Sequence, residues 1–254
     1  MLEVRRLTKR FTGLVAVDNV SFSLLPGEVS GYLGPNGSGK STTVKMLTGL
    51  LAPTSGEILF QGRNIKDNPI EYKRRLGYVP EEPFLYPYLT GPEYLELTGR
   101  LRGLPEELLK HKIDGFIELF SLRTNRYSPL ASYSKGMRQK ILISAALMHD
   151  PDVLIFDEPL SGLDVTAALV FRDLVGRLAQ DGKIILFSSH VLEVVERICS
   201  RVIILHRGKM VAHETVEALR ELMKLPSLED IFNQLVMQED PGQLAADMIA
   251  VMKL

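Results

Sequence analysis

Cysteine is almost absent from this chain, and long apolar runs are missing altogether. The one cysteine, Cys199, excludes an internal disulfide and any zinc site made of cysteines alone, which fits a reducing cytoplasm. Each apolar stretch falls well short of the roughly 20 residues of a membrane-spanning helix. The opening residues 1–6 lack the apolar segment of a secretory signal, so we expect no signal peptide.

Net charge is also nearly absent, because 30 Lys and Arg residues face 31 Asp and Glu residues and leave a formal charge of −1. This balance provides no overall cationic field for nucleic acid, so we expect no nucleic-acid partner, although a local basic patch stays compatible with it. With 254 residues, of which 45% are hydrophobic, the chain can bury a sizeable core. Its size suits one domain with subdomains or two small domains.

The chain does contain a glycine-rich run at residues 34–42, Gly-Pro-Asn-Gly-Ser-Gly-Lys-Ser-Thr, which matches G-x-x-x-x-G-K-[ST]. The glycines permit backbone conformations in which successive N–H groups turn toward phosphate oxygens. Lys40 adds a positive charge toward the β- and γ-phosphates, and the Ser41 hydroxyl is a ligand for Mg²⁺. The run predicts ATP and Mg²⁺ as ligands, with the nucleotide in contact with Asn36, Gly37, Ser38, Gly39, Lys40, Ser41 and Thr42.

The segments on either side of this run favour the same interpretation. Residues 29–33 have the pattern of a short buried strand, and a helix is expected from Ser41 to about Leu50. The positive end of that helix dipole would point at the phosphates. The alternative, a glycine-rich turn without function, explains neither the spacing nor the flanking strand and helix.

A second apolar strand is predicted at residues 153–156, and two adjacent carboxylates, Asp157 and Glu158, end it. Because successive side chains diverge at a strand end, the two are expected to have different roles. Asp157 would reach the Mg²⁺ beside Ser41, whereas Glu158 would accept a proton from the attacking water. The alternative is a solvated acidic loop, which the apolar run before it and the phosphate loop upstream disfavour.

Residues 133–139, Tyr-Ser-Lys-Gly-Met-Arg-Gln, resemble the signature motif of ATP-binding cassette (ABC) proteins, Leu-Ser-Gly-Gly-Gln. Ser134 and Gly136 match this motif, whereas Tyr133, Lys135 and Met137 depart from it. Ser134 is also suited to cap the helix that follows. The resemblance implies that Ser134 and Gly136 complete the ATP site of a second cassette, so that the protein works as a dimer. Lys135 would either meet the phosphate of that partner or point into solvent.

Further motifs extend the resemblance over nearly the whole chain. Residues 161–164, Ser-Gly-Leu-Asp, are similar to the family's D-loop, which implies that Asp164 belongs to the nucleotide site. His190 follows an apolar strand at 184–187 and resembles the family's switch histidine, with hydrogen bonds to the γ-phosphate and to the attacking water. Phe11 stands where the family places an aromatic ring against adenine. Packing of Phe11 in the core is the alternative.

Glu81 stands at the position of the family's Q-loop glutamine and so replaces a neutral amide by a carboxylate. Unit charges about 4 Å apart interact by about 4 kcal/mol at an effective dielectric constant of about 20. Glu81 would therefore either join Ser41 and Asp157 as a Mg²⁺ ligand or repel phosphate. Together with the signature variants and residues 228–232, Leu-Glu-Asp-Ile-Phe, it resembles the ATPase subunits of ABC-2 type transporters, which are mostly exporters.

The predicted fold class is α/β: a P-loop NTPase with a RecA-like core and a mainly parallel sheet. An N-terminal antiparallel β subdomain and an inserted helical subdomain complete it. We expect an ABC nucleotide-binding domain over residues 1–220, with the helical subdomain at about 84–150, and a C-terminal helical tail at 221–254. Breaks in the tail are predicted at Pro226 and Pro241. A regulatory or dimer-forming tail competes with one that packs on the core.

The resemblance implies an ATP-hydrolysing subunit of an ABC transporter, in which Lys40, Glu158 and His190 are catalytic. A second cassette, identical to this one or different from it, and a separate membrane-spanning subunit are the implied partners, with transport in the export direction. The protein would be peripheral, on the cytoplasmic face of the cell membrane. Two alternatives stay open: a soluble ABC ATPase, and an ATP-gated switch or scaffold that transports nothing.

Overall fold

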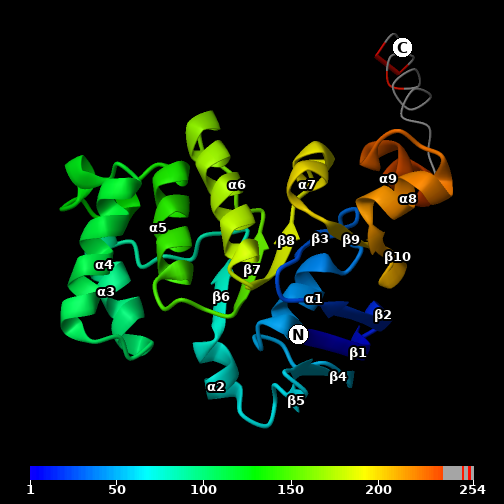
Figure 1. Cartoon of the computed structure of the whole chain (residues 1–254), viewed down its shortest axis with the longest axis horizontal. Coiled ribbons are helices and arrows are strands. Elements are labelled where there is room, and N and C mark those ends of the chain that lie inside the picture. The colour runs from blue at the N-terminus through cyan, green and yellow to red at the C-terminus, as the bar shows by residue number, and fades with distance from the viewer. Residues whose placement is uncertain (237–247, 249–250, 253–254) are drawn as a thin grey trace.

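Two β-sheets lie at the centre of the computed structural model, which describes residues 1–236, 248 and 251–252 (Figure 1). The smaller sheet is antiparallel and has the strand order β2-β1-β4-β5. The larger has the order β10-β9-β3-β8-β7-β6 and is parallel except where β10 pairs with β9. The strands are β1 (Leu2–Phe11), β2 (Leu14–Leu24), β3 (Val29–Leu33), β4 (Ser55–Phe60), β5 (Arg63–Asn64), β6 (Leu76–Val79), β7 (Val153–Asp157), β8 (Ile184–Ser188), β9 (Arg201–His206) and β10 (Lys209–Thr215).

The strands β3, β7 and β8 are buried at every position. Their sequences are nearly continuous apolar runs because elements cover both faces of the sheet. Val29 of β3 and Leu154 of β7 both pair with Ile185 of β8, so the three strands are in step. Their carboxyl ends therefore meet at one edge of the sheet, where ligands bind in open α/β sheets.

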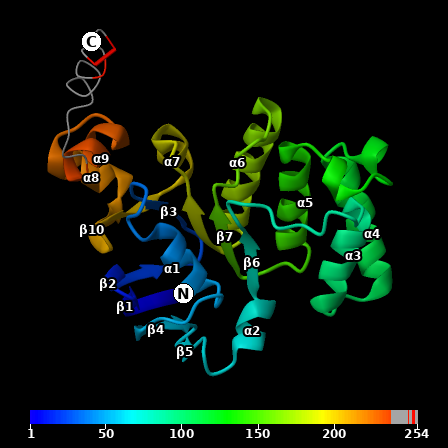
Figure 2. The ribbon, with the colours of Figure 1, turned by 180° about the vertical axis from the view of Figure 1, so that it is seen from behind.

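Helices surround this sheet, and one group of them stands apart. Figure 2, the view from behind, shows α3, α4 and α5 gathered at one end of the molecule, with α8 and α9 at the other. The α-helices are α1 (Lys40–Leu47), α2 (Pro69–Arg74), α3 (Gly91–Leu101), α4 (Glu106–Leu119), α5 (Lys135–Leu147), α6 (Val165–Gln180), α7 (Leu192–Ile198), α8 (Val216–Met223) and α9 (Leu228–Val236), and the 3₁₀ turns are η1 (Arg123–Asn125) and η2 (Leu130–Ser132).

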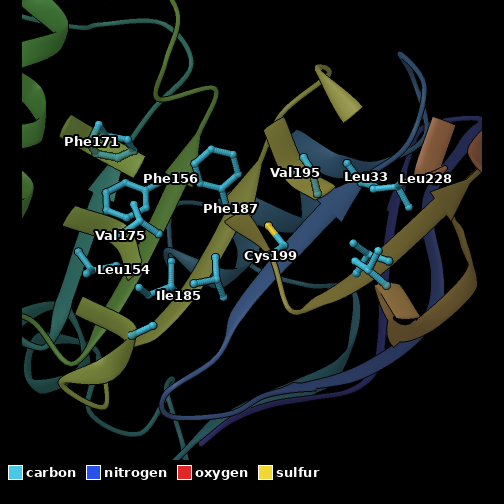
Figure 3. Close-up of a cluster of buried hydrophobic side chains, with 14 of the residues drawn as sticks. Leu33, Leu154, Phe156, Phe171, Val175, Ile185, Phe187, Val195, Cys199 and Leu228 are labelled. Atoms are coloured by element: carbon cyan, nitrogen blue, oxygen red, sulfur yellow. The ribbon is translucent and has the colours of Figure 1, made fainter. Parts of the chain in front are cut away.

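Three clusters of buried side chains fill the described part of the chain. One lies between the larger sheet and α6 to α9; Figure 3 shows its residues, including Phe156, Phe187 and Leu228. A second joins the two sheets and α1. The third is formed by α3, α4, α5 and the turns between them, including Leu95, Leu109 and Ile141. The helices α3 to α5 thus have a core of their own, which allows them to pack as a subdomain.

Local sequence accounts for several helix boundaries. Thr90 begins α3 through a capping box, because its hydroxyl accepts from the Glu93 N–H while the Glu93 carboxylate accepts from the Thr90 N–H. Helix α1 ends at Leu47, three residues before the expected Leu50. Gly49 takes a left-handed conformation (φ +69°) and turns the chain out of the helix.

The antiparallel sheet near the N-terminus and the mainly parallel larger sheet confirm the predicted fold class. In the C-terminal region, Pro226 separates α8 from α9, and both helices pack against the core. The predicted break at Pro241 lies outside the described residues. Across the segments that the structure does describe, every helix is too short or too polar to cross a bilayer.

Candidate nucleotide site

A cavity of about 930 Å³ lies at the carboxyl ends of β3, β7 and β8. Segments far apart in the sequence line it: the β1–β2 turn, the glycine-rich loop, the segment after β6, and the residues that follow β7 and β8. It brings together most of the predicted site residues, namely Phe11, Asn36, Gly37, Gly39, Lys40, Ser41, Thr42, Glu81, Asp157, Glu158 and His190. Ser38, Ser134, Gly136 and Asp164 do not line it.

The glycine-rich loop needs glycine where it approaches β2. Gly39 has φ +102°, and a Cβ there would lie 2.4 Å from the backbone oxygen of Ala16, so no other residue fits this position unstrained. Ser38 is buried beneath the loop, and its carbonyl accepts from the Gly208 N–H at 3.0 Å. These contacts fix the loop to β2 and to the β9–β10 turn.

Lys40 is the cation of the phosphate loop in this cavity. Its ammonium donates to the carbonyl of Gly34 and, at 3.1 Å, to that of Pro35. Burial lowers the pKa of Lys40, while the carboxylates of Glu158, Asp157 and Glu81 act in the opposite direction. The lysine is therefore held beside the phosphate loop and faces three carboxylates, an arrangement suited to bridging phosphate oxygens.

Asp157, at the end of β7, is only 5% exposed. Burial raises its pKa to about 6, and the neighbouring carboxylates of Glu81 and Glu158 act in the same direction. A divalent cation would relieve this cost, because it favours the ionised form of its ligands.

The residues present fit Mg²⁺. Asp157, Glu81 and the Ser41 hydroxyl line one cavity and offer only oxygen donors. Within the described residues, no group of three or more His, Cys, Asp or Glu side chains forms a ready-made metal cage. Mg²⁺ is usually held by one or two carboxylates together with substrate phosphates and water, so such a cage is not required.

Glu158 and His190 are in direct contact, which the sequence pattern did not predict. Nδ1 of His190 lies 2.9 Å from Oε2 of Glu158, and the Ser189 hydroxyl donates to the same oxygen at 3.5 Å. Because β7 and β8 are neighbours, the Glu158 N–H donates to the Ser188 carbonyl at 3.0 Å. The backbone of Glu158 is left-handed (φ +50°), which costs a non-glycine residue about 1 kcal/mol and turns its side chain into the cavity.

The contrast in burial between the two side chains is large. The Glu158 carboxylate is largely buried, whereas the His190 side chain is 78% exposed. A carboxylate held at the cavity wall can accept a proton there, and an exposed imidazole can reach groups that enter from solvent.

Phe11 lines the cavity from the end of β1, in the smaller sheet. Its side chain is 47% exposed and belongs to none of the buried clusters, so the core-packing alternative does not hold. Lys9 holds its ammonium 5.2 Å from the ring centroid. An exposed aromatic face beside a phosphate site is suited to stacking on a base.

The signature residues and the D-loop contact each other instead of the cavity. Ser134 caps α5 as predicted, because its hydroxyl accepts from the Met137 N–H at 3.2 Å. Asp164 caps α6 and accepts from the Ala167 N–H at 2.8 Å.

Gly136 shows how closely these two segments approach. A Cβ at Gly136 would lie 2.3 Å from the carbonyl oxygen of Gly162, and the aliphatic stem of Lys135 lies against Gly162. The absence of a side chain at Gly136 therefore serves contact within the chain. This surface lies outside the nucleotide cavity of its own chain.

Among the further lining residues that sequence reasoning missed are Leu192, Arg207 and Phe232. They come from the start of α7, the β9–β10 turn and the middle of α9. Only the resemblance of residues 228–232 to a family segment pointed toward any of them. All three lie far along the chain from the phosphate loop, so no local sequence pattern connects them with it.

Comparison with known proteins identifies the family. The family model described as ABC transporter matches residues 17–161. The chain is also 39% identical over 229 residues to the ABC transporter ATP-binding protein NatA of Bacillus subtilis (strain 168), covering 90% of this chain and 93% of NatA. This chain belongs to the ABC transporter family. It is an ATP-binding ABC cassette with ATPase function, as predicted.

Solved structures agree with this assignment. The cassette superimposes with a TM-score of 0.87 on the ATP-binding subunit of an ABC transporter, at 35% identity, with 92% of this chain and 99% of that one covered. It also matches a dimeric ATP-binding cassette in a post-hydrolysis state bound to ADP and Pi, with a TM-score of 0.78, 25% identity and coverage of 85% and 98%. Both similarities extend over most of the fold.

Proposed function

We propose that this cassette hydrolyses Mg-ATP as one half of a dimer and drives export through a separate membrane-spanning subunit. The observation that carries the proposal is the Glu158–His190 pair, which shares one cavity with Lys40 and Asp157. A binding protein needs only the phosphate loop, whereas hydrolysis also needs a base for water.

Each residue has a distinct part in this reaction. The loop N–H groups and Lys40 hold the β- and γ-phosphates, and Phe11 stacks on adenine. Asp157, Ser41 and Glu81 would hold Mg²⁺, which would neutralise charge on the phosphates. The contacts of Glu158 with Ser189 and His190 use Oε2, so we assign Oε1 to the attacking water. His190 then orients that water and the γ-phosphate.

The dimer follows from the position of the signature residues. Ser134, Gly136 and Asp164 lie outside the cavity of their own chain. In a second cassette facing the first, the same residues would close each nucleotide site from the other side. Two sites would then form together, which links ATP binding to closure of the dimer.

The membrane-spanning partner is proposed to dock near Glu81. The segment that follows Glu81 exposes three aromatic side chains, Phe84 at 83%, Tyr86 at 62% and Tyr88 at 91%. Exposed aromatic residues are enriched at protein interfaces. Docking there would place this chain at the cytoplasmic face of the membrane. The export direction rests on the Glu81 and signature variants.

The first test is steady-state Mg-ATP hydrolysis by the purified chain and by Glu158→Gln. Glutamine keeps the shape of the side chain but cannot take up the proton, so we expect a loss of at least about 100-fold in kcat. Size-exclusion chromatography in ATP should show a stable dimer for Glu158→Gln. Glu107→Gln, an exposed position in α4, is the matched control and should hydrolyse ATP like the wild type.

Two results would contradict the proposal. Equal hydrolysis by Glu158→Gln and wild type would remove Glu158 as the base. Binding of ATP without hydrolysis by the wild type, even with a membrane partner present, would leave an ATP-gated switch, and Glu81→Gln would be the next variant to measure.

A further inference from the structure

Helix α9 contributes a side chain to the nucleotide cavity although it lies near the other end of the chain from the phosphate loop. Phe232 of α9 lines the cavity together with Leu192 and Arg207. Phe232 and Leu192 are both partly buried and both pack against the core cluster of the larger sheet. The cavity thus has a wall that comes from outside the phosphate loop and the strand ends.

Helix α9 packs against the core of the larger sheet next to this wall of the cavity. Leu228 and Ile231 are fully buried, and both belong to the same buried cluster as Leu33, the last residue of the strand that leads into the phosphate loop (Figure 3). Val195 of α7 belongs to the same cluster. Helix α9 therefore packs in the same buried cluster as the strand that leads into the phosphate loop and as α7.

Polar contacts join α9 to α7 as well. Glu196 of α7 accepts from the Leu228 N–H at 3.4 Å and forms an ion pair with Arg220 of α8. One carboxylate therefore binds α7 to both C-terminal helices. Figure 1 shows the three helices as neighbours at one end of the larger sheet.

Helix α7 begins at Leu192, two residues after His190. The Ser189 hydroxyl accepts from the Val191 N–H at 3.1 Å and donates to Glu158, so the segment 189–192 is one short turn between the base and α7. A contact that positions the start of α7 therefore also constrains the backbone of His190, which belongs to the same turn.

We propose that α9 is part of the nucleotide site and that Phe232 is a positioning residue, which holds the turn that carries His190 against the cavity. The ring of Phe232 supplies an apolar wall of the cavity that Leu192 also lines. This inference rests on the proposed function, because positioning of His190 matters only if His190 takes part in ATP turnover.

The chain contains no tryptophan, so a tryptophan placed in α9 reports on that position alone. In Phe232→Trp the emission should change on addition of Mg-ATP. Leu235→Trp is the matched control, because Leu235 is partly buried on the same helix but does not line the cavity. Equilibrium dialysis with labelled ATP measures binding by each variant. If Phe232→Trp lost ATP binding while Leu235→Trp kept it, this result would also support a place for residue 232 at the nucleotide site.

Kinetics then test whether Phe232 acts through His190. Phe232→Ala should lower kcat by about threefold to tenfold, and Phe232→Leu should restore most of it. In a His190→Ala background, Phe232→Ala should have almost no further effect, because residues that act as a unit are not additive. Thermal unfolding of each variant controls for loss of structure, and the leucine variant carries the test if the alanine variant fails to fold.

Two results would overturn the inference. One is a tryptophan emission that Mg-ATP leaves unchanged in the Phe232→Trp variant although this variant still binds labelled ATP. The other is a loss of kcat caused by Phe232→Ala that is as large in the His190→Ala background as in the wild-type background. If the wild type binds ATP but shows no turnover even with a membrane partner present, the proposed function fails, and the fluorescence titration alone decides the place of α9.

Discussion

At the scale of single residues, the burial of Asp157 gives the folded chain a measurable pH dependence. Its folded pKa of about 6 lies above the roughly 3.9 of an unfolded aspartate, so the folded state binds the proton more tightly. The stability contributed by this group is present below about pH 4 and is lost as the pH rises through 6.

We expect the free energy of unfolding of the wild type, relative to Asp157→Asn, to rise by about 1 kcal/mol between pH 7 and pH 5. Urea unfolding in EDTA, without nucleotide, measures this at both pH values, and the asparagine variant is the control because it cannot titrate. A difference that stays level, or that falls toward pH 5, would show that Asp157 ionises normally.

The sequence correctly predicted that residues belong to the cavity where a local pattern marks them. The glycine-rich loop, Asp157 and His190 each belong to a predicted strand end, and parallel strands bring their ends together. The contact of Glu158 with His190 was missed, since it depends on a left-handed backbone at Glu158 that is a property of the turn and not of any residue pattern.

At the scale of elements, α5 and the D-loop meet so closely that Gly136 is required for packing within the chain. In Gly136→Ala the new Cβ would lie 2.3 Å from the Gly162 oxygen, so the D-loop must shift. We expect a loss of about 1–3 kcal/mol in the free energy of unfolding, the usual cost of overpacking. Denaturant unfolding checks this.

Gly115→Ala is the matched control, because Gly115 is also a helical glycine but has open space where a Cβ would stand. Removing glycine from a helix interior should there raise the stability by about 0.5–1 kcal/mol. If the two alanine variants were equally stable, the close approach of α5 to the D-loop would not exist in solution.

Sequence predicted the elements themselves better than the contacts between them. Ser134 and Asp164 are typical capping residues, so the starts of α5 and α6 are visible in the sequence. That α5 packs on the D-loop through Gly136, and that Phe232 of α9 reaches the nucleotide cavity, follows from tertiary packing between distant segments. No local periodicity contains that information.

At the scale of the whole molecule, the proposed nucleotide site is divided into two half-sites that lie apart on one chain. The cavity with Lys40 and Glu158 lies at the strand ends, whereas Ser134 and Gly136 lie at the start of α5 and outside that cavity. A symmetric pair of chains would combine each cavity with the signature residues of the other. A variant with a defect in the cavity and a variant with a defect in the signature residues should therefore recover ATP hydrolysis when they are mixed.

Two variants allow this test. Lys40→Ala removes the phosphate cation and leaves the signature intact. Ser134→Asp leaves the loop intact and still caps α5, because aspartate is a good N-cap, but it places a negative charge where a partner's γ-phosphate would lie. Each variant alone should hydrolyse no ATP. Mixed in equal amounts, about half of the dimers would contain one chain of each kind, and each of these has one intact site of two.

We expect the mixture to recover up to about a quarter of wild-type hydrolysis, and less if the two sites must act together. The control replaces Lys40→Ala by a chain that carries both changes; mixed with Ser134→Asp, it offers no intact pair and should stay inactive. If the first mixture also stayed inactive while chromatography showed mixed dimers, Ser134 would not act on a partner's nucleotide. The cap that it provides to α5 would then be its whole role.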